Sequence, residues 1–221
     1  MTSDARPRPT VIAGGGIAGL TAALAFARQG FPVRVFEQAR QFEPFGAGLQ
    51  LSPNATHILD RLGVLALLRP KAVQPDAVLL RDAATLKVLA RIPLGEMAER
   101  RWKAPYLSVH RADLHAALAE TAAQNPTIEI VTGARATGQV ASRDGLLAAS
   151  FARDGRHEVE DARLLVSADG VWSDLRTTLF PDSRRRLSGS LAWRATVAAD
   201  SPAGQAFCAI TSPDCVTTFL D

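Results

Sequence analysis

The pattern of hydrophobic and polar positions divides the first part of the chain into buried strands and an intervening helix. Three apolar residues, Val11 to Ala13, lead into a glycine-rich turn and then into a stretch rich in alanine and leucine. A second apolar run follows and ends at Glu37. Two buried runs joined by a helix are typical of a parallel β–α–β unit. We therefore expect an α/β fold with a Rossmann-like, mostly parallel sheet.

Patterns typical of helices and of strands recur along the rest of the chain. A helix is predicted to be capped by Asn54 and ended by Gly63, and a longer amphipathic helix is predicted over 111–124. Short strands with turns at Asp144-Gly145 and Asp154-Gly155 predict a β-meander. Helices are also expected over 64–68 and 174–179, and strands over 77–82, 87–92, 106–109, 128–131, 134–141, 146–151, 158–161, 164–168, 191–198, 207–211 and 216–220.

The turn after the first strand carries the spacing Gly-x-Gly-x-x-Gly, with glycines at 14, 16 and 19. Gly14 allows the tight turn, Gly16 lets the backbone approach a pyrophosphate, and Gly19 lets the helix pack against the strand. Ile17 and Ala18 begin the helix, whose N-terminus offers N–H donors and a positive dipole end to an anion. An ordinary strand–turn–helix is the alternative interpretation.

Glu37 lies 18 residues after Gly19, close to the spacing of the acid that binds a ribose in dinucleotide-binding units. Its carboxylate can accept hydrogen bonds from both ribose hydroxyls and would repel a 2′-phosphate. The predicted ligand is therefore the adenosine part of FAD or NAD, rather than NADP. Gln38, the next residue, is included in the predicted cofactor site.

Composition excludes several classes of function. The formal charge of +3 and the scattered arginines argue against a nucleic-acid surface. The basic run 184–186 is either a solvated turn or an anion-contacting patch. Cys208 and Cys215 have no zinc-site spacing, so no metal is expected. The sequence has neither a signal peptide nor a membrane-spanning stretch, which predicts a cytoplasmic protein without stable membrane insertion.

Three segments together resemble the N-terminal part of class A flavoprotein monooxygenases, the salicylate- and hydroxybenzoate-type aromatic hydroxylases. The first is the glycine motif with Glu37. The second combines Gly-Ala-Gly-Leu-Gln-Leu-Ser-Pro-Asn-Ala at 46–55 with Val-His-Arg-Ala-Asp-Leu-His at 109–115. The third is Ser-Ala-Asp-Gly-Val-Trp-Ser-Asp-Leu-Arg at 167–176. The resemblance implies an FAD-binding domain with part of an antiparallel sheet that covers the substrate.

The resemblance also implies roles for further residues. The segment 46–50, with the site residues Gly48, Leu49 and Gln50, would run beside the isoalloxazine ring, although a plain surface loop is the alternative. Arg111 would reach the pyrophosphate, or else pair with Asp113 or Glu120.

Asp169 and Gly170 would lie near the pyrophosphate, with Arg176 as an electrostatic neighbour; for Asp169 the alternative is a capping role. Trp193 and Arg194 would contact a flat anionic substrate, although a core tryptophan beside an exposed arginine is the alternative.

For function, the resemblance implies hydroxylation of a small phenolic or benzoate-type substrate with NADH or NADPH and O2, with no catalytic side chain assigned. The predicted FAD-binding domain is 1–76 and 102–182, and the partial substrate-binding sheet is 77–101 and 183–221. The family's Gly-Asp dipeptide is absent. We therefore expect a fragment of a longer hydroxylase, or a chain that depends on a partner or forms a homo-oligomer. The alternatives are a flavoprotein acting on a prenyl- or quinone-type substrate and a non-catalytic FAD- or NAD-binding remnant.

Overall fold

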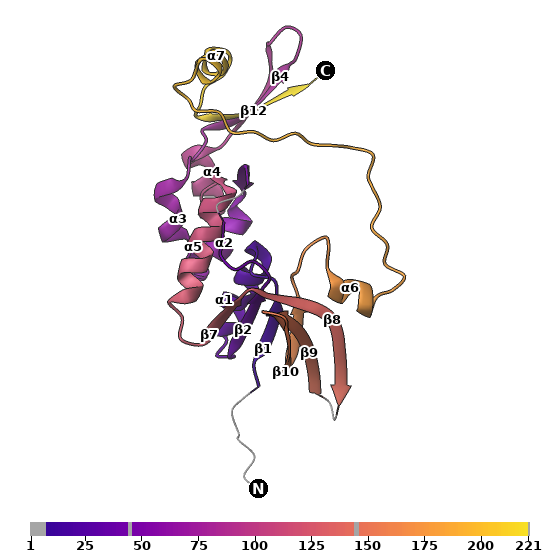
Figure 1. The fold of residues 1–221 in the computed structure, drawn as a ribbon. Helices are drawn as coiled ribbons and strands as arrows, with labels where there is room; N and C mark the ends of the chain where they lie inside the picture. Colours follow the sequence, from indigo (N-terminus) through magenta and orange to yellow (C-terminus); the bar gives the residue numbers. More distant parts are fainter. Residues whose placement is uncertain (1–7, 44–45, 144–145, 221) are drawn as a thin grey trace. The chain divides into compact units, whose positions relative to one another are not determined.

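The structure is a computed structural model that describes residues 8–43, 46–143 and 146–220. The chain forms two compact units, one of residues 1–44 and 115–191 and the other of residues 45–114 and 192–221. The boundary at residue 115 falls inside helix α5 (Arg111–Ala123). Each unit is described by itself (Figure 1).

A four-stranded parallel sheet forms the centre of the first unit, in the order β11-β1-β2-β7. Its strands are rich in valine and isoleucine, as is typical of parallel strands that are covered on both faces. Helix α1 (Ile17–Arg28) contacts β1, β2 and β7. The strands are β1 (Thr10–Ala13), β2 (Val33–Glu37), β7 (Ile128–Thr132) and β11 (Leu164–Ser167).

An antiparallel meander packs against the other face of this sheet. Its strands are β8 (Ala134–Arg143), β9 (Leu146–Arg153) and β10 (Arg156–Ala162), and it is joined by helix α6 (Asp174–Leu179). Side chains alternate along a strand, so Val11 and Ala13 join the core shared with the meander. Ile12 between them approaches Gly19 of α1. Figure 1 shows the meander beside the parallel strands.

Ion pairing also joins these two layers. Arg34 of β2 pairs with Glu129 of β7, Nε to Oε2 at 2.8 Å, and with Glu160 of β10. The same guanidinium lies over the ring of Phe36, 5.2 Å from its centroid. Planar guanidinium groups suit such combined ion pairing and stacking. Arg34 therefore links the edge of the parallel sheet to the meander.

The second unit contains two small sheets and several short helices. Strand β3 (Gly48–Leu51) pairs antiparallel with β6 (Leu107–His110). The other sheet has the order β12-β4-β5, in which β4 and β5 are antiparallel and β12 is parallel to β4. The strands of this sheet are β4 (Ala77–Asp82), β5 (Val88–Pro93) and β12 (Cys215–Leu220). The helices of the second unit are α2 (Pro53–Arg61), α3 (Leu65–Leu68), a 3-10 turn at Arg69–Lys71, α4 (Gly95–Trp102) and α7 (Pro202–Ile210).

The α/β fold class is confirmed, with a mostly parallel sheet and a meander. The cap of α2 is a correction. Ser52 occupies the N-cap and Pro53 begins the helix, while Asn54 lies in its first turn and accepts a hydrogen bond from the Ser52 hydroxyl. Proline at the first helical position has its φ already fixed for the helix. Gly63 follows the helix with a positive φ of 77°, as predicted.

Two predicted strands near the C-terminus are wrong. Residues 191–198 have no regular structure, and no strand pairs with them in the described part of the chain. Residues 207–210 belong to helix α7 and not to a strand. Ser201 caps this helix by accepting a hydrogen bond from the Gly204 N–H at 3.1 Å, and Pro202 begins it. This local start signal prevails over the apolar run that follows it.

The remaining predictions concern two turns, the domain boundaries and membrane-spanning segments. The turn at Asp144-Gly145 lies outside the described residues, whereas Asp154 and Gly155 both have positive φ, as a two-residue hairpin turn requires. The domain boundaries predicted from the sequence stay a prediction. Across the described ranges, no helix combines the length and apolar character needed to cross a bilayer.

Candidate cofactor site

The glycine motif forms a close-packed turn between β1 and α1. Gly14 has φ 104°, and a Cβ there would lie 2.4 Å from the carbonyl oxygen of Ala168. A Cβ on Gly19 would lie 1.9 Å from the carbonyl oxygen of Gly14. Both contacts are with backbone, which has little freedom to move aside. The positive φ of Gly14 agrees with its predicted role in the tight turn, and the close contact at Gly19 agrees with its predicted packing role.

Gly16 differs from the other two glycines of the motif. It occupies the N-cap of α1 with φ −73°, and a Cβ there would meet nothing within 4 Å. In the described part of the chain, the N–H groups of Gly16, Ile17 and Ala18 have no hydrogen-bond acceptor. Three unpaired donors at a helix N-terminus beside open space can accept an anionic oxygen.

Glu37 closes β2 beside this loop. Its Oε2 accepts a hydrogen bond from the Gly15 N–H at 2.6 Å, and its Oε1 accepts one from the Ala39 N–H at 2.8 Å. A carboxylate can accept about four hydrogen bonds, so these two contacts leave room for a diol. Gln38, which lies between Glu37 and Ala39 in the sequence, is exposed. The carboxylate therefore orders the glycine loop in addition to its predicted role toward a ribose.

Sequence reasoning missed Gly15 and the residues that enclose it. The Nε2 of His115, on α5, lies 2.8 Å from the Gly15 carbonyl oxygen. Phe42 packs edge-on against the His115 ring, with centroids 4.7 Å apart. A Cβ on Gly15 would lie 3.0 Å from both Phe42 and the Cβ of Glu37. The sequence assigns no role to His115, whose hydrogen-bond partner lies 100 residues away along the chain.

Asp169 follows β11 at the carboxyl end of the sheet, next to the glycine turn. A Cβ on Gly14 would lie 3.0 Å from the Cα of Asp169. The Asp169 carboxylate accepts a hydrogen bond from the Ser167 hydroxyl at 2.6 Å. Gly170, with φ 81°, has open space where a Cβ would stand. The structure therefore brings Gly14, Asp169 and Gly170 together, at the edge where ligands of open α/β sheets bind.

Two interpretations of this segment are corrected. Ser173 caps α6, because its hydroxyl oxygen accepts the Arg176 N–H at 2.8 Å, so Asp169 is not the helix cap. The predicted neighbour Arg176 donates from its guanidinium to the carbonyl oxygen of Val171 at 2.6 Å. In the described ranges no ion pair joins Arg176 to Asp169. The Asp169 carboxylate is therefore held by Ser167 alone among those residues.

The predicted flavin-ring segment lies in the second unit. Gly48, Leu49 and Gln50 form β3 and pair with β6, with Gly48 opposite His110. The Tyr106 hydroxyl donates to Oε1 of Gln50, and burial raises the pKa of Tyr106. The Arg111 N–H donates to the Ala47 carbonyl oxygen at 3.0 Å. The two segments of the second motif, 46–55 and 109–115, are thus hydrogen-bonded neighbours.

Trp193 and Arg194 lie in the stretch without regular structure that precedes α7. Trp193 is 95% exposed, so it is not the core tryptophan of the alternative interpretation. The structure brings neither residue onto a strand. Their predicted contact with a substrate stays a prediction.

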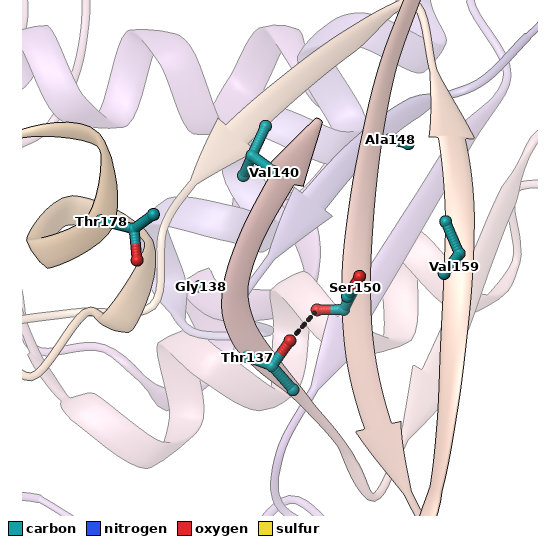
Figure 2. Close-up of a pocket in the computed structure, with 7 residues that line it drawn as sticks. All are labelled: Thr137, Gly138, Val140, Ala148, Ser150, Val159 and Thr178. Carbon is teal, nitrogen blue, oxygen red and sulfur yellow. Dashed lines mark hydrogen bonds between the residues drawn. The ribbon is translucent and has the colours of Figure 1, made fainter. Parts of the chain in front are cut away.

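An open hollow of about 430 Å³ lies between α6 and the meander. Figure 2 shows its lining, which includes Thr137, Val140, Ser150 and Thr178. The Thr137 hydroxyl donates to the Ser150 carbonyl oxygen at 3.1 Å. Among the described lining residues, none carries a charge and none belongs to the predicted cofactor site. Several lining residues lie at a bulge in β8, where the register with β9 shifts between Ala136 and Val140.

Comparison with known proteins identifies this arrangement. The sequence model of the family described as "FAD binding domain" matches residues 8–207. The chain belongs to this FAD-binding domain family. The resemblance to class A FAD-dependent aromatic monooxygenases is thereby confirmed, and FAD is the family's cofactor.

Individual relatives of this FAD-binding domain include named aromatic hydroxylases. A 3-hydroxybenzoate 6-hydroxylase of Polaromonas naphthalenivorans is 37% identical over 197 residues, which are 89% of this chain and 48% of the relative. A 6-hydroxynicotinate 3-monooxygenase of Bordetella bronchiseptica is 40% identical over 86% of this chain and 48% of its own length. The solved structure of a 2-methyl-3-hydroxypyridine-5-carboxylic acid oxygenase superposes with TM-score 0.63 at 29% identity, covering 79% of this chain and 42% of that one. The chain spans about half the length of the curated relatives it matches.

The residues of this FAD-binding domain fit the cofactor that names the family. The open N–H donors at Gly16, Ile17 and Ala18 suit a pyrophosphate, and the Glu37 carboxylate beside them suits a ribose. Across the described residues, no group of histidine, cysteine and acidic side chains is arranged to hold a metal ion.

Proposed function

We propose that this chain is the FAD-binding part of a monooxygenase that hydroxylates a small phenolic or benzoate-type aromatic compound, with NADH or NADPH and O2 as co-substrates. The observation that carries the proposal is the loop at the N-terminus of α1. It combines three N–H donors that have no acceptor among the described residues with a neighbouring carboxylate, in a chain that belongs to the FAD-binding domain family. The named activities of the relatives support the reaction type.

The proposed roles follow the positions of the side chains. Gly14, Gly16 and Gly19 shape the loop that receives the pyrophosphate, and Glu37 accepts hydrogen bonds from the adenosine ribose. Asp169 and Gly170 lie next to Gly14 and would complete the same end of the sheet. When bound, FAD would supply the redox chemistry with O2, which no side chain provides. The chain itself binds and orients the cofactor.

Arg111 and the β3 segment extend the proposal to the second unit. Arg111 would contribute fixed guanidinium donors to the pyrophosphate, and it shares a face of α5 with His115, four residues later. Gly48, Leu49 and Gln50 would run beside the flavin ring, where Tyr106 already orients the Gln50 amide. Trp193 and Arg194 would contact the substrate. Their exposure makes them available to a ligand or to further protein.

A titration with FAD tests the first part of the proposal. The purified chain is titrated while flavin fluorescence and the visible spectrum are recorded, with NADP and NAD as competitors. We expect a perturbed flavin band, and competition by NAD that exceeds competition by NADP, because Glu37 would repel a 2′-phosphate. An unperturbed flavin spectrum at saturating protein would contradict FAD binding by this chain.

Oxygen uptake tests the catalytic part. NADH- and NADPH-dependent oxygen consumption is measured with 3-hydroxybenzoate, 6-hydroxynicotinate and a quinone precursor, and the products are analysed by mass. A product of an aromatic acid that has gained one oxygen atom, either with the carboxylate retained or with its loss as CO2 when the oxygen enters at the carbon that carried it, would support the proposed hydroxylase. FAD binding without oxygen consumption would favour a non-catalytic FAD-binding chain, and turnover of the quinone precursor alone would favour the related flavoprotein class. A cytoplasmic location stays a prediction.

A further inference from the structure

We propose that His115 is a positioning residue for the cofactor, which fixes the orientation of the peptide between Gly15 and Gly16. This inference rests on the proposed function, in which the glycine loop binds FAD. It goes beyond the glycine motif itself, because it assigns the loop's geometry to a side chain from helix α5. No distance from His115 to the cofactor is needed for the argument.

The Gly15 residue is held from both sides. Its N–H donates to Oε2 of Glu37 at 2.6 Å, and its carbonyl oxygen lies 2.8 Å from Nε2 of His115. A carbonyl oxygen can only accept, so Nε2 of His115 is the donor and carries the proton. Gly15 is buried, and both contacts are partly shielded from water, which strengthens them.

The orientation of this peptide decides where the Gly16 N–H points. The peptide bond is planar and trans, so the Gly15 carbonyl and the Gly16 N–H point in opposite directions. With the carbonyl directed to His115, the N–H is directed away from α5. Gly16 has open space where a Cβ would stand and no acceptor among the described residues. His115 thereby keeps a donor available for the pyrophosphate.

The loop needs such a restraint because glycine flanks the peptide on both sides. Neither Gly15 nor Gly16 has a Cβ to restrict its backbone, so the peptide could rotate at little cost. A rotated peptide would present the Gly15 carbonyl oxygen to a phosphate, and two negative groups would then face each other. The hydrogen bond from His115 opposes this rotation.

Phe42 fixes the donor in turn. Its ring packs edge-on against the imidazole of His115, at an interplanar angle of 68°. The same Phe42 ring stands where a side chain on Gly15 would project. The imidazole is therefore oriented by packing, and a side chain on Gly15 would have to displace the Phe42 ring that orients it.

A set of variants separates the hydrogen bond from the packing. His115→Phe keeps a ring against Phe42 and removes the donor, whereas His115→Gln keeps an N–H donor at a similar reach. His57→Phe is the matched control, because Nε2 of His57 on α2 also lies 2.8 Å from a backbone carbonyl oxygen, that of Trp102. His115→Asn, whose amide is too short to reach, replaces His115→Phe if that variant does not fold.

Two measurements are made on the 221-residue chain. The first is the FAD dissociation constant from flavin fluorescence, and the second is the exchange rate of the Gly15 amide hydrogen, measured by NMR without ligand. We expect His115→Phe to weaken FAD binding roughly tenfold and to speed Gly15 exchange by a similar factor, the size of one hydrogen bond. His115→Gln and His57→Phe should stay within about threefold of the unmodified chain.

Failure of this inference can be distinguished from failure of the proposed function. Unchanged FAD binding and unchanged Gly15 exchange in His115→Phe would overturn the inference. So would equal losses in His115→Gln or in His57→Phe, because a general loss of stability would then explain them. If the unmodified chain binds no FAD, the proposed function fails, and the Gly15 exchange rate alone decides whether His115 orders the loop.

Discussion

Phe36 and Phe151 stack face to face, with ring centroids 3.9 Å apart and 13° between the ring planes. Phe36 belongs to β2 of the parallel sheet and Phe151 to β9 of the meander, and both are buried. The residue after Phe36 is Glu37, whose carboxylate holds the glycine loop. The stack therefore anchors the end of the strand from which the cofactor loop is ordered.

Removing one ring of this stack should destabilise the first unit. Phe151 is fully buried, and truncating a buried phenylalanine to alanine typically costs about 3–5 kcal/mol. We expect Phe151→Ala to lower the free energy of unfolding by that amount in a urea titration. Phe219→Ala, at a position 37% exposed on β12, should cost clearly less. Equal losses for the two variants would contradict the assignment of Phe151 to the core.

Substitutions at Gly19 and at Gly16 should affect stability and FAD binding to different extents. Gly19→Ala places a Cβ 1.9 Å from a backbone oxygen, so we expect a loss of stability of about 1–3 kcal/mol or more together with the loss of FAD binding. Gly16→Ala meets no atom of the described residues and should change stability by less than about 1 kcal/mol. It should still weaken FAD binding about tenfold or more, since the cofactor would occupy that space.

Thermal unfolding and fluorescence titration of both variants check this prediction. Tight FAD binding by Gly16→Ala would show that the pyrophosphate lies elsewhere. A Gly19→Ala variant as stable as the unmodified chain would show that helix α1 can shift away from β1.

Replacing Glu37 by glutamine should weaken the loop. The amide oxygen of glutamine can accept from only one of the two backbone N–H groups that the carboxylate now serves, those of Gly15 and Ala39. Hydrogen bonds to a charged group contribute about 1.5–3 kcal/mol, so we expect FAD affinity to fall by roughly 10- to 100-fold. Isothermal calorimetry measures the change. Glu158→Gln, at an exposed position on β10, is the control and should bind FAD normally.

The β4–β5 hairpin should show a defined acid response. The Thr85 hydroxyl, and then the Thr85 N–H, donate to Oδ1 of Asp82 and hold the pKa of Asp82 below its usual 3.8. Because the folded pKa is lowered, these bonds stabilise the turn above pH 3.8 and lose this effect as the pH falls through the lowered pKa. A carboxyl NMR titration should show the pKa of Asp82 rising toward 3.8 in Thr85→Ala but not in Thr85→Ser. Identical titrations in the two variants would show that the Thr85 hydroxyl is not the main cause of the lowered pKa of Asp82.

Local patterns predicted the part of the site whose residues lie close together in the sequence. The turn at Gly14, the helix after Gly16 and the strand ending at Glu37 depend on neighbours within one β–α–β unit, so spacing and residue type suffice. The same holds for the meander, because each hairpin pairs adjacent segments. The start of α7 at Ser201-Pro202 was also a local signal, which the apolar run after it concealed.

Tertiary structure decided the contacts that join distant segments. The hydrogen bond between His115 and Gly15 spans 100 residues, and nothing in either local sequence indicates its partner. The stretch 191–198 has strand-like composition, but a strand forms only where another strand supplies hydrogen-bond partners, and the described residues provide none. The sequence by itself thus determined the glycine turn and the fold class. Which distant side chains hold the turn depends on packing, because contacts between segments follow from the three-dimensional arrangement and not from spacing along the chain.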